Sequence, residues 1–304
     1  MSGAQISAGM DHGLYRWSPL PSRPLLRWPD GASLAVVIVL CLEMVEWEPH
    51  DESAPQSARG AVYPRIFDPT LLSLHEYGNR VGVFRVLDVL DRLELPATAA
   101  VDALVAERRG LLVEECAARR FSFAGHGLSA SRMTTEQLGE DEERGRIERC
   151  LAGVARLTGS QPRGWLSVGY GESARTPALL AEAGVRYVCD WPNDEQPYPM
   201  RTAGGELVSL PAAVDLDDVT AMRLRSLSVQ EWAGMVERAS ERLLADGGDS
   251  GRLLVLVLHP YLIGQPFRIR ALEQVLSRVA AAPGVRFATA DGVLDWYEES
   301  RSRA

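Results

Sequence analysis

The sequence predicts an α/β fold in which parallel strands form a barrel, and three observations lead to this prediction. Short apolar runs alternate with helical patterns along most of the 304 residues. Most of these runs are apolar at consecutive positions, as expected for parallel strands that are covered on both faces. About eight strand-like and seven helix-like segments alternate, and this number favours a barrel over an open sheet.

The expected strands lie at residues 34–42, 97–101, 121–124, 164–168, 185–189, 207–210, 253–258 and 285–288. The expected helices lie at residues 80–93, 110–119, 135–158, 177–183, 228–246, 268–282 and 290–299. Thr134 and Gln137 have the spacing of a capping box, so the third of these helices is predicted to begin near residue 135. The charged run from Glu140 to Arg146 allows i,i+4 ion pairs and is expected to form a solvated face.

The chain is expected to form one domain with an N-terminal arm. It has no internal repeat and no linker rich in Gly or Ser. Prolines and tryptophans punctuate residues 1–30, which are predicted to be the arm, and residues 31–304 are predicted to be a single barrel domain. Residues 44–79 show no clear period and are expected to form a long loop over one end of the barrel.

Composition and charge exclude several classes of protein. Hydrophobic residues make up 46% and charged residues 24%, so disordered, collagen-like and coiled-coil chains are excluded. The longest apolar run, residues 34–42, has nine residues and is too short to cross a bilayer. The chain has 32 Lys and Arg against 41 Asp and Glu, and this net charge of −9 argues against nucleic acid or an anionic membrane as a partner.

Two features indicate a cytoplasmic protein. The N-terminus lacks the basic start and the apolar stretch of a signal peptide. The four cysteines show no C-x-x-C spacing and are expected to be buried, reduced thiols. Whether identical subunits assemble into a homo-oligomer is left open.

Polar side chains directly follow four of the expected strands. Glu43 follows the first strand, His126 the third, Asp190 the fifth and His259 the seventh. In parallel α/β folds the chemistry lies where strands end and βα loops begin. A carboxylate next to a nine-residue apolar strand is also costly unless it is paired or used, so Glu43 is read as functional ahead of structural. These four residues are the candidate catalytic group.

Each candidate also has a plainer interpretation. His126, between two glycines, can be a turn histidine, and Asp190 can simply cap the next segment. Residues in the same loops are candidates for the walls of a pocket, but the tryptophans among them are more commonly core residues; the set is Glu46, Trp47, Trp165, Tyr170 and Trp191. The other histidines, His12, His50 and His75, lie away from strand ends and are interpreted as surface or loop residues.

A rival motif lies in the middle of the chain. Residues 169–174 read G-Y-G-E-S-A after an expected strand, and Asp190 follows 19 residues after Gly171, which imitates a dinucleotide-binding fingerprint. However, Thr176 and Pro177 have the pattern of an N-cap followed by proline at the first helical position. The helix would then begin after Ala174, so nucleotide binding is not favoured.

The chain resembles the polysaccharide deacetylase (NodB-homology) superfamily from about Trp28 to its C-terminus, and its allantoinase-like or cyclic imidase-like branch in particular. The matching segments are Trp28-Pro29-Asp30-Gly31, Glu43, Gly78-Asn79-Arg80-Val81-Gly82, Gly125-His126-Gly127, Arg163-Gly164-Trp165-Leu166, Arg175-Thr176-Pro177, Asp190-Trp191, Leu258-His259-Pro260-Tyr261, and Gly264-Gln265-Pro266 with Arg268 and Arg270. The resemblance implies a distorted (β/α) barrel, which agrees with the number of alternating segments.

The departures from the family concern the metal. A typical member has two adjacent aspartates after its first strand, a base and a metal ligand, where this chain has Glu43 and Met44. The second typical motif has two histidines four residues apart, and here His126 is followed at that spacing by Ala130. A catalytic zinc generally needs three protein ligands, so no cofactor is expected. Zinc held by Glu43, Glu46 and His126 is the weaker alternative.

The sequence and the resemblance together predict a hydrolase that acts on a non-peptide C–N bond of a small linear or cyclic amide, such as a ureide, an imide or a hydantoin. Glu43 would be the general base, with Glu46 tuning its pKa, and His259 the general acid. His126 would orient water or substrate, and Asp190 would orient His259. The alternatives are a metal-dependent deacetylase of acetylated sugars and a binding protein without catalysis.

Overall fold

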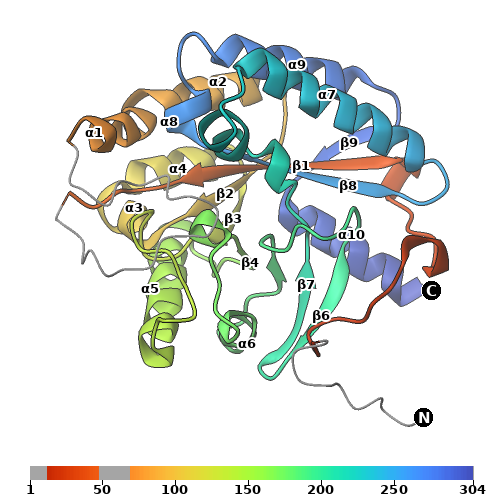
Figure 1. The fold of residues 1–304 in the computed structure, drawn as a ribbon, viewed down its shortest axis with the longest axis horizontal. Coiled ribbons are helices and arrows are strands. Elements are labelled where there is room, and N and C mark those ends of the chain that lie inside the picture. Colours follow the sequence, from red (N-terminus) through yellow and green to blue (C-terminus); the bar gives the residue numbers. More distant parts are fainter. Residues whose placement is uncertain (1–11, 48–68, 304) are drawn as a thin grey trace.

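The computed structural model describes residues 12–47 and 69–303, and its centre is a curled, mostly parallel sheet (Figure 1). Within these residues the sheet has nine strands, in the order β6-β7-β5-β4-β3-β2-β1-β8, with β9 also paired to β1. The strands are β1 (Leu34–Leu42), β2 (Thr98–Val101), β3 (Ser122–Gly125), β4 (Gly164–Trp165), β5 (Tyr187–Val188), β6 (Tyr198–Thr202), β7 (Gly205–Ser209), β8 (Arg252–Leu258) and β9 (Val285–Ala288). Every pairing is parallel except that of β6 with β7, which confirms the predicted α/β barrel type.

The sheet curls back on itself beyond β7. Ala212 forms an isolated parallel bridge with Val255 of β8, and the amide of Ala213 donates to the Val255 carbonyl. On the same side the amide of Leu253 donates to the carbonyl of Glu195. The barrel is therefore distorted, since single bridges replace a full strand pairing between its two edges.

The helices lie between the strands and cover the outside of the sheet. They are α1 (Pro69–Tyr77), α2 (Val83–Arg92), α3 (Ala103–Arg108), α4 (Gly110–Ala118), α5 (Glu140–Thr158), α6 (Thr176–Glu182), α7 (Val229–Asp246), α8 (Pro260–Ile263), α9 (Ile269–Ala281) and α10 (Ala290–Arg303). Two π-helical turns, Gly78–Gly82 and Thr220–Leu224, join α1 to α2 and precede α7. No helix in the described part of the chain is both long and apolar enough to cross a membrane.

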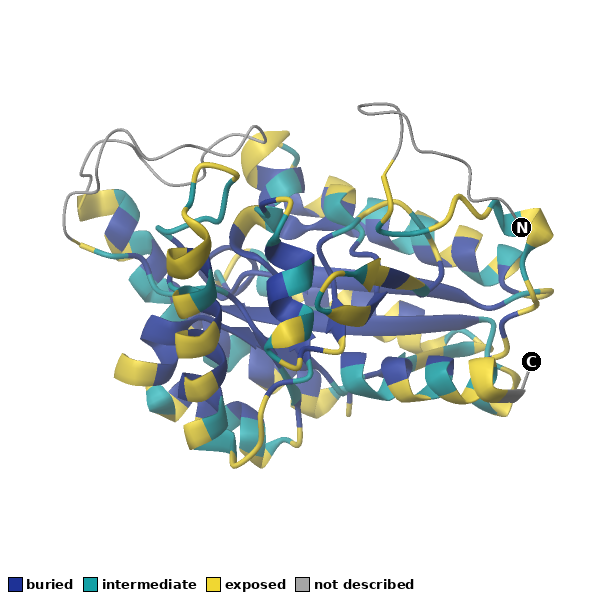
Figure 2. Cartoon of the chain, turned by 90° about the horizontal axis from the view of Figure 1, so that it is seen from below, coloured by how far each residue is buried: buried dark blue, intermediate teal, exposed yellow. Residues whose placement is uncertain are grey.

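Two apolar clusters explain why β1 is apolar at every position. Leu34, Val36 and Ile38 pack outward with residues of α2, α7 and α9, while Ala35 and Val37 face a second cluster that includes residues of α10. All nine residues of β1 are buried, as the consecutive apolar pattern predicts. Figure 2 shows the strands buried inside and the exposed residues on the outer faces of the helices.

Several boundaries differ from the sequence prediction. Helix α5 begins at Glu140 after the N-cap Gly139, so Thr134 does not cap it. Of the predicted loop at 44–79, Pro69–Tyr77 is helical, and residues 48–68 lie outside the described part. Strand β6 was not predicted because only Met200 in it is buried, so this antiparallel edge strand lacks an apolar run. The short helices α3 and α8 were also not predicted.

Candidate active site

Glu43 is the buried residue on which the site is built. It directly follows β1, and its side chain is 5% exposed. Its Oε1 lies 3.1 Å from Nε2 of His126 and 3.9 Å from Nε2 of His259. His126 directly follows β3 and His259 directly follows β8, so the carboxyl ends of three parallel strands bring these side chains together. The structure thus joins three of the four residues proposed as catalytic.

The backbone around Glu43 is held by two side chains from other segments. Nδ2 of Asn79 donates to the Glu43 carbonyl at 2.7 Å. Asp102, the N-cap of α3, accepts from the amides of Met44 at 2.6 Å and Val105 at 2.7 Å. The bonds from Asn79 to the Glu43 carbonyl and from the Met44 amide to Asp102 cross between segments that are far apart in the sequence. The strand end that carries Glu43 is therefore fixed from both sides.

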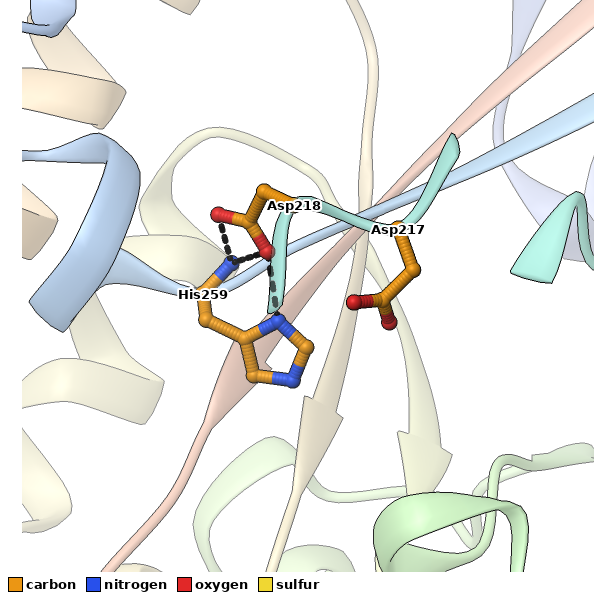
Figure 3. Close-up of side chains that lie close together, drawn as sticks. All are labelled: Asp217, Asp218 and His259. Atoms are coloured by element: carbon orange, nitrogen blue, oxygen red, sulfur yellow. Dashed lines mark hydrogen bonds and ion pairs between the residues drawn. The ribbon is translucent and has the colours of Figure 1, made fainter. Parts of the chain in front are cut away.

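His259 is oriented by Asp218 (Figure 3). Both oxygens of Asp218 accept from the His259 amide, at 3.1 and 3.0 Å, and Oδ1 also lies 2.7 Å from Nδ1 of the ring. A carboxylate on Nδ1 fixes the tautomer with its proton there and leaves Nε2 directed toward Glu43. The carboxylate that orients His259 is therefore Asp218. The sequence analysis had proposed Asp190 for this role.

Asp190 lies beside a different group. Its Oδ1 accepts from the Ser167 amide at 2.7 Å, and its Oδ2 accepts from the Ser167 hydroxyl at 3.0 Å. Burial raises the pKa of Asp190 and of the neighbouring Glu172. The charge of Asp190 raises the pKa of Glu172 further, while the hydrogen bond with Glu172 lowers that of Asp190. The negative charge of Asp190 also acts on His126. Asp190 thus belongs to the surroundings of His126 rather than to those of His259.

Asp217, next to Asp218, accepts three hydrogen bonds. Its Oδ1 accepts from the amides of Val219 and Thr220, at 2.8 and 2.9 Å, and its Oδ2 accepts from the hydroxyl of Tyr170 at 2.7 Å. Sequence reasoning missed both aspartates because neither directly follows an expected strand. The acidic run of Asp215, Asp217 and Asp218, a few residues after the expected strand at 207–210, was the available signal.

His126 is held in place through its other ring nitrogen. Its Nδ1 lies 2.5 Å from the carbonyl of Leu166, so this nitrogen carries a proton that it donates. Burial disfavours the charged ring, but its contacts with Cys41 and Glu43 raise the pKa of His126 well above its ordinary value. The ring is therefore a cation whose Nε2–H donates to Glu43.

The charges of the three groups support one another. Burial alone would raise the pKa of Glu43, but the positive charges of His259 and His126 and the hydrogen bond from His126 lower it to about 2. Burial likewise opposes the charge on His259, while Cys41, Asp217, Glu43 and Asp218 raise the pKa of His259 well above its ordinary value. At neutral pH the site holds an ionised Glu43 and a protonated His259.

A third histidine lies at the site, and the sequence analysis had interpreted it as a surface or loop residue. His75 of α1 is 7% exposed, and its ring centroid lies 3.9 Å from that of Tyr261. Burial lowers the pKa of His75 to about 4, although Glu43 raises it. His75 is therefore neutral. Its helix was missed because the region before it shows no clear period.

The residues proposed as pocket walls have different places. Trp165 is a core residue, 2% exposed, whose Nε1 donates to the Ser167 hydroxyl at 2.9 Å. Glu46 pairs with Arg132 at 2.9 Å and accepts from the Ser129 hydroxyl at 2.6 Å. Trp47 is 41% exposed.

The two remaining wall candidates are only partly buried. Tyr170 contributes its hydroxyl to Asp217, as described above. Trp191 is half-buried and lies edge-on to Tyr15, with 5.9 Å between their ring centroids.

The donor set does not fit a catalytic divalent metal. The Met44 carbonyl accepts from the amide of Ala130 at 3.0 Å, so the two positions that would carry ligands in the family lie together and offer no ligand side chain. In the described residues one group has ligand atoms within 4.8 Å of one another, namely Asp217, Asp218 and His259. Its carboxylates already accept from backbone amides, a tyrosine and the His259 ring, so this group is a hydrogen-bond network.

Comparison with known proteins gives a family match for part of the chain and a similar fold for most of it. Residues 69–188 match the family model for polysaccharide deacetylase. No curated protein sequence matches the chain.

Several solved structures are similar to the chain over most of its length. The structure of PuuE allantoinase is 23% identical with a TM-score of 0.83, covering 97% of this chain and 98% of its own. A structure described as a probable polysaccharide deacetylase from Pseudomonas aeruginosa PAO1 is 24% identical with a TM-score of 0.80, covering 91% of this chain and 95% of its own. A third structure, from Mycobacterium smegmatis, is also described only provisionally as a polysaccharide deacetylase. It is 25% identical with a TM-score of 0.74, covering 92% of this chain and 94% of its own. Residues 69–188 therefore match the polysaccharide deacetylase family, and the fold of the whole chain is similar to that of these solved structures.

Proposed function

We propose that the protein hydrolyses a non-peptide C–N bond in a small linear or cyclic amide, such as a ureide, an imide or a hydantoin. The observation that carries this proposal is the placement of an ionised carboxylate, Glu43, between two protonated histidines, with His259 held by Asp218. A base and an acid that differ so widely in pKa and lie within a few ångströms are what acid–base hydrolysis of an amide requires.

Glu43 is the general base in this proposal. It takes a proton from water while the water oxygen attacks the carbonyl carbon of the amide. A base works best when its pKa is near the operating pH, and the pKa of Glu43, about 2 in the free protein, is low for this task. A substrate placed between Glu43 and His259 would weaken their mutual attraction and raise that pKa. The base would then become stronger only when substrate is bound.

His259 is the general acid. Its Nδ1–H is donated to Asp218, so the proton on Nε2 is the one available for transfer. When the C–N bond breaks, this proton passes to the leaving nitrogen, and the products are a carboxylic acid and an amine, or a single ring-opened molecule if the amide is cyclic. Asp218, which accepts from Nδ1, stabilises the imidazolium that must be present before the transfer.

His126 holds the base in position. Its two ring nitrogens contact the Leu166 carbonyl and Glu43, so the carboxylate cannot rotate freely. The positive charge of the His126 ring also keeps Glu43 ionised. In this proposal His126 acts through Glu43, and Glu43 takes the proton from the water.

A metal-dependent deacetylase of acetylated sugars is the second candidate, because the matching family model carries the description polysaccharide deacetylase. The likeness to PuuE allantoinase, over 97% of the chain, favours the cyclic or linear amide instead. The absence of ligand side chains at Met44 and Ala130 points the same way.

The experiment that tests the proposal is hydrolysis of a panel of cyclic imides, hydantoins and linear ureides by the wild type and by Glu43→Gln. Wild-type turnover that falls about 10²–10⁴-fold in the variant is the expected result. Glu43→Gln keeps the shape and most hydrogen bonds of the side chain, so an unchanged melting temperature is expected alongside. Turnover of acetylated sugars but not of any amide in the panel would favour the second candidate.

A further inference from the structure

Two arginines near the site lack the acidic partner that most arginines in this protein have. Ion pairs link most of the described arginines to Asp or Glu, for example Arg23 to Asp194 at 2.6 Å. Within residues 12–47 and 69–303, neither Arg223 nor Arg268 has such a pair, although the chain carries a net charge of −9. Arg268 is half-buried, so its charge is partly removed from water without an ion pair to a carboxylate in the described residues.

The two arginines belong to the same two segments as the His259–Asp218 pair. Arg223 lies in the π-helical turn Thr220–Leu224, which begins two residues after Asp218. Arg268 follows α8, the short helix that begins directly after His259, and its Nη1 donates to the Leu262 carbonyl at 3.3 Å. Because Asp218 and His259 are hydrogen-bonded, the two segments that carry the arginines meet at the catalytic group.

The electrostatic effects agree with this placement. Burial and then the charge of Arg223 lower the pKa of Arg268, which is a sign that the two guanidinium groups are close to each other. Asp218 and Tyr261 act on Arg268 as well, and the charge of Arg223 acts on Tyr261 and His75. Two like charges held together next to a site are unfavourable until an anion lies between them.

Other features prepare Arg268 for such an anion. Its guanidinium lies 4.6 Å from the centroid of the Phe267 ring, and its bond to the Leu262 carbonyl restrains it further. It is also the N-cap of α9, a helix of 13 residues, so the positive end of the helix dipole lies at the same place. These restraints reduce the conformational entropy that a flexible arginine loses on binding.

We propose that Arg223 and Arg268 form a carboxylate-binding subsite of the active site, so that the amide hydrolysed by this protein carries a carboxylate. This inference rests on the proposed hydrolase function and names its substrate class: an acidic ureide, imide or hydantoin rather than a neutral one. The subsite binds the carboxylate through the two guanidinium groups and presents the scissile bond to Glu43 and His259. Arginine suits this role because its planar donors match the geometry of a carboxylate.

The test uses two ligands of equal size that differ only in charge, hydantoin-5-acetate and hydantoin-5-acetamide. Calorimetry on the wild-type protein is expected to show the acetate binding at least about tenfold more tightly than the acetamide, a preference that falls with added salt. Arg223→Gln and Arg268→Gln should each reduce this preference about tenfold.

Arg270→Gln is the matched control. Arg270 is exposed on the same helix, and side chains two residues apart on a helix do not face each other. This variant removes the same net charge and should keep the preference for the acetate. Equal binding of the two ligands, or an equal loss in Arg270→Gln, would overturn the proposal.

A second measurement does not depend on the hydantoin ring. Phenylglyoxal modifies arginines, and succinate is expected to protect Arg223 and Arg268 from it while succinamide does not, as read by mass spectrometry. No protection by succinate, together with no binding preference, would overturn the subsite. The two proposals fail separately: turnover of neutral amides without a charge preference removes the subsite alone, while arginine-dependent binding without any hydrolysis removes the hydrolase alone.

Discussion

Asp218 binds both the backbone and the ring of His259. The two oxygens of Asp218 lie 3.1 and 3.0 Å from the His259 amide nitrogen, and Oδ1 of Asp218 also lies 2.7 Å from Nδ1 of the ring. The loop before α7 and the end of β8 are thereby joined at one residue. The opposite ring nitrogen then lies 3.9 Å from Glu43. Nothing in the order of residues along the chain indicates this partnership, since 41 positions separate the two residues.

Asp218→Asn should reduce turnover about 10²–10⁴-fold, because an amide cannot hold the Nδ1–H tautomer or stabilise the imidazolium as a carboxylate does. Loss of the negative charge also lowers the pKa of His259, so the alkaline fall in rate should move to lower pH. Asp190→Asn is the comparison, and it should leave that limb in place. If Asp190→Asn moves the alkaline limb and Asp218→Asn leaves it in place, Asp190 is the residue that orients His259.

The pH–rate profile should have a broad plateau through neutral pH. Glu43 must be ionised, and its lowered pKa of about 2 keeps it so until the pH falls toward that value. His259 must be protonated, and its raised pKa delays the fall in rate on the alkaline side. Initial rates of a verified substrate between pH 4 and pH 10 provide the measurement. A rate that rises steeply through pH 6 to 7 would mean that a histidine must lose its proton, contrary to the proposed roles.

Zinc should be present at well under one equivalent in the purified protein, since Met44 and Ala130 stand where the family has ligands and the Asp217–Asp218–His259 group is satisfied by protein donors. Elemental analysis measures this directly. Turnover should survive treatment with a chelator. Stoichiometric metal together with activity lost on chelation and restored by zinc would promote the deacetylase alternative.

His75→Phe should keep the stack on Tyr261 but remove a neutral hydrogen-bonding ring next to Glu43. We expect a rise in KM with little change in the melting temperature, because the aromatic contact is preserved. His75→Ala loses the contact as well and should be less stable than His75→Phe. Equal kinetics of the wild type and His75→Phe would show that the ring contributes only packing.

Ser228→Ala should destabilise the protein by about 1 kcal/mol, because Ser228 and Glu231 form the capping box of α7. Thr134→Ala removes the hydroxyl that the sequence alone suggested as a cap and should change stability by less than about 0.5 kcal/mol. Urea denaturation of both variants makes the comparison. A larger loss in Thr134→Ala would contradict the observed start of α5 at Glu140.

The sequence by itself determined the elements with strong local signals. The nine apolar residues of β1 predict a buried parallel strand because both faces must be covered, and the ends of such strands predict Glu43, His126 and His259 at one edge. Local patterns could not place β6, which buries a single residue, or the start of α5, whose cap is a glycine.

The tertiary structure alone decided which carboxylate meets which histidine. Hydrogen bonds depend on side-chain atoms lying within about 3 Å, and that proximity arises from loops whose paths no periodicity records. The tertiary structure brought Asp218 rather than Asp190 to His259 and buried His75 against Tyr261. It also left Arg223 and Arg268 without acidic partners in the described chain. Burial then set the charges, because the pKa of each group depends on the neighbours that replace water.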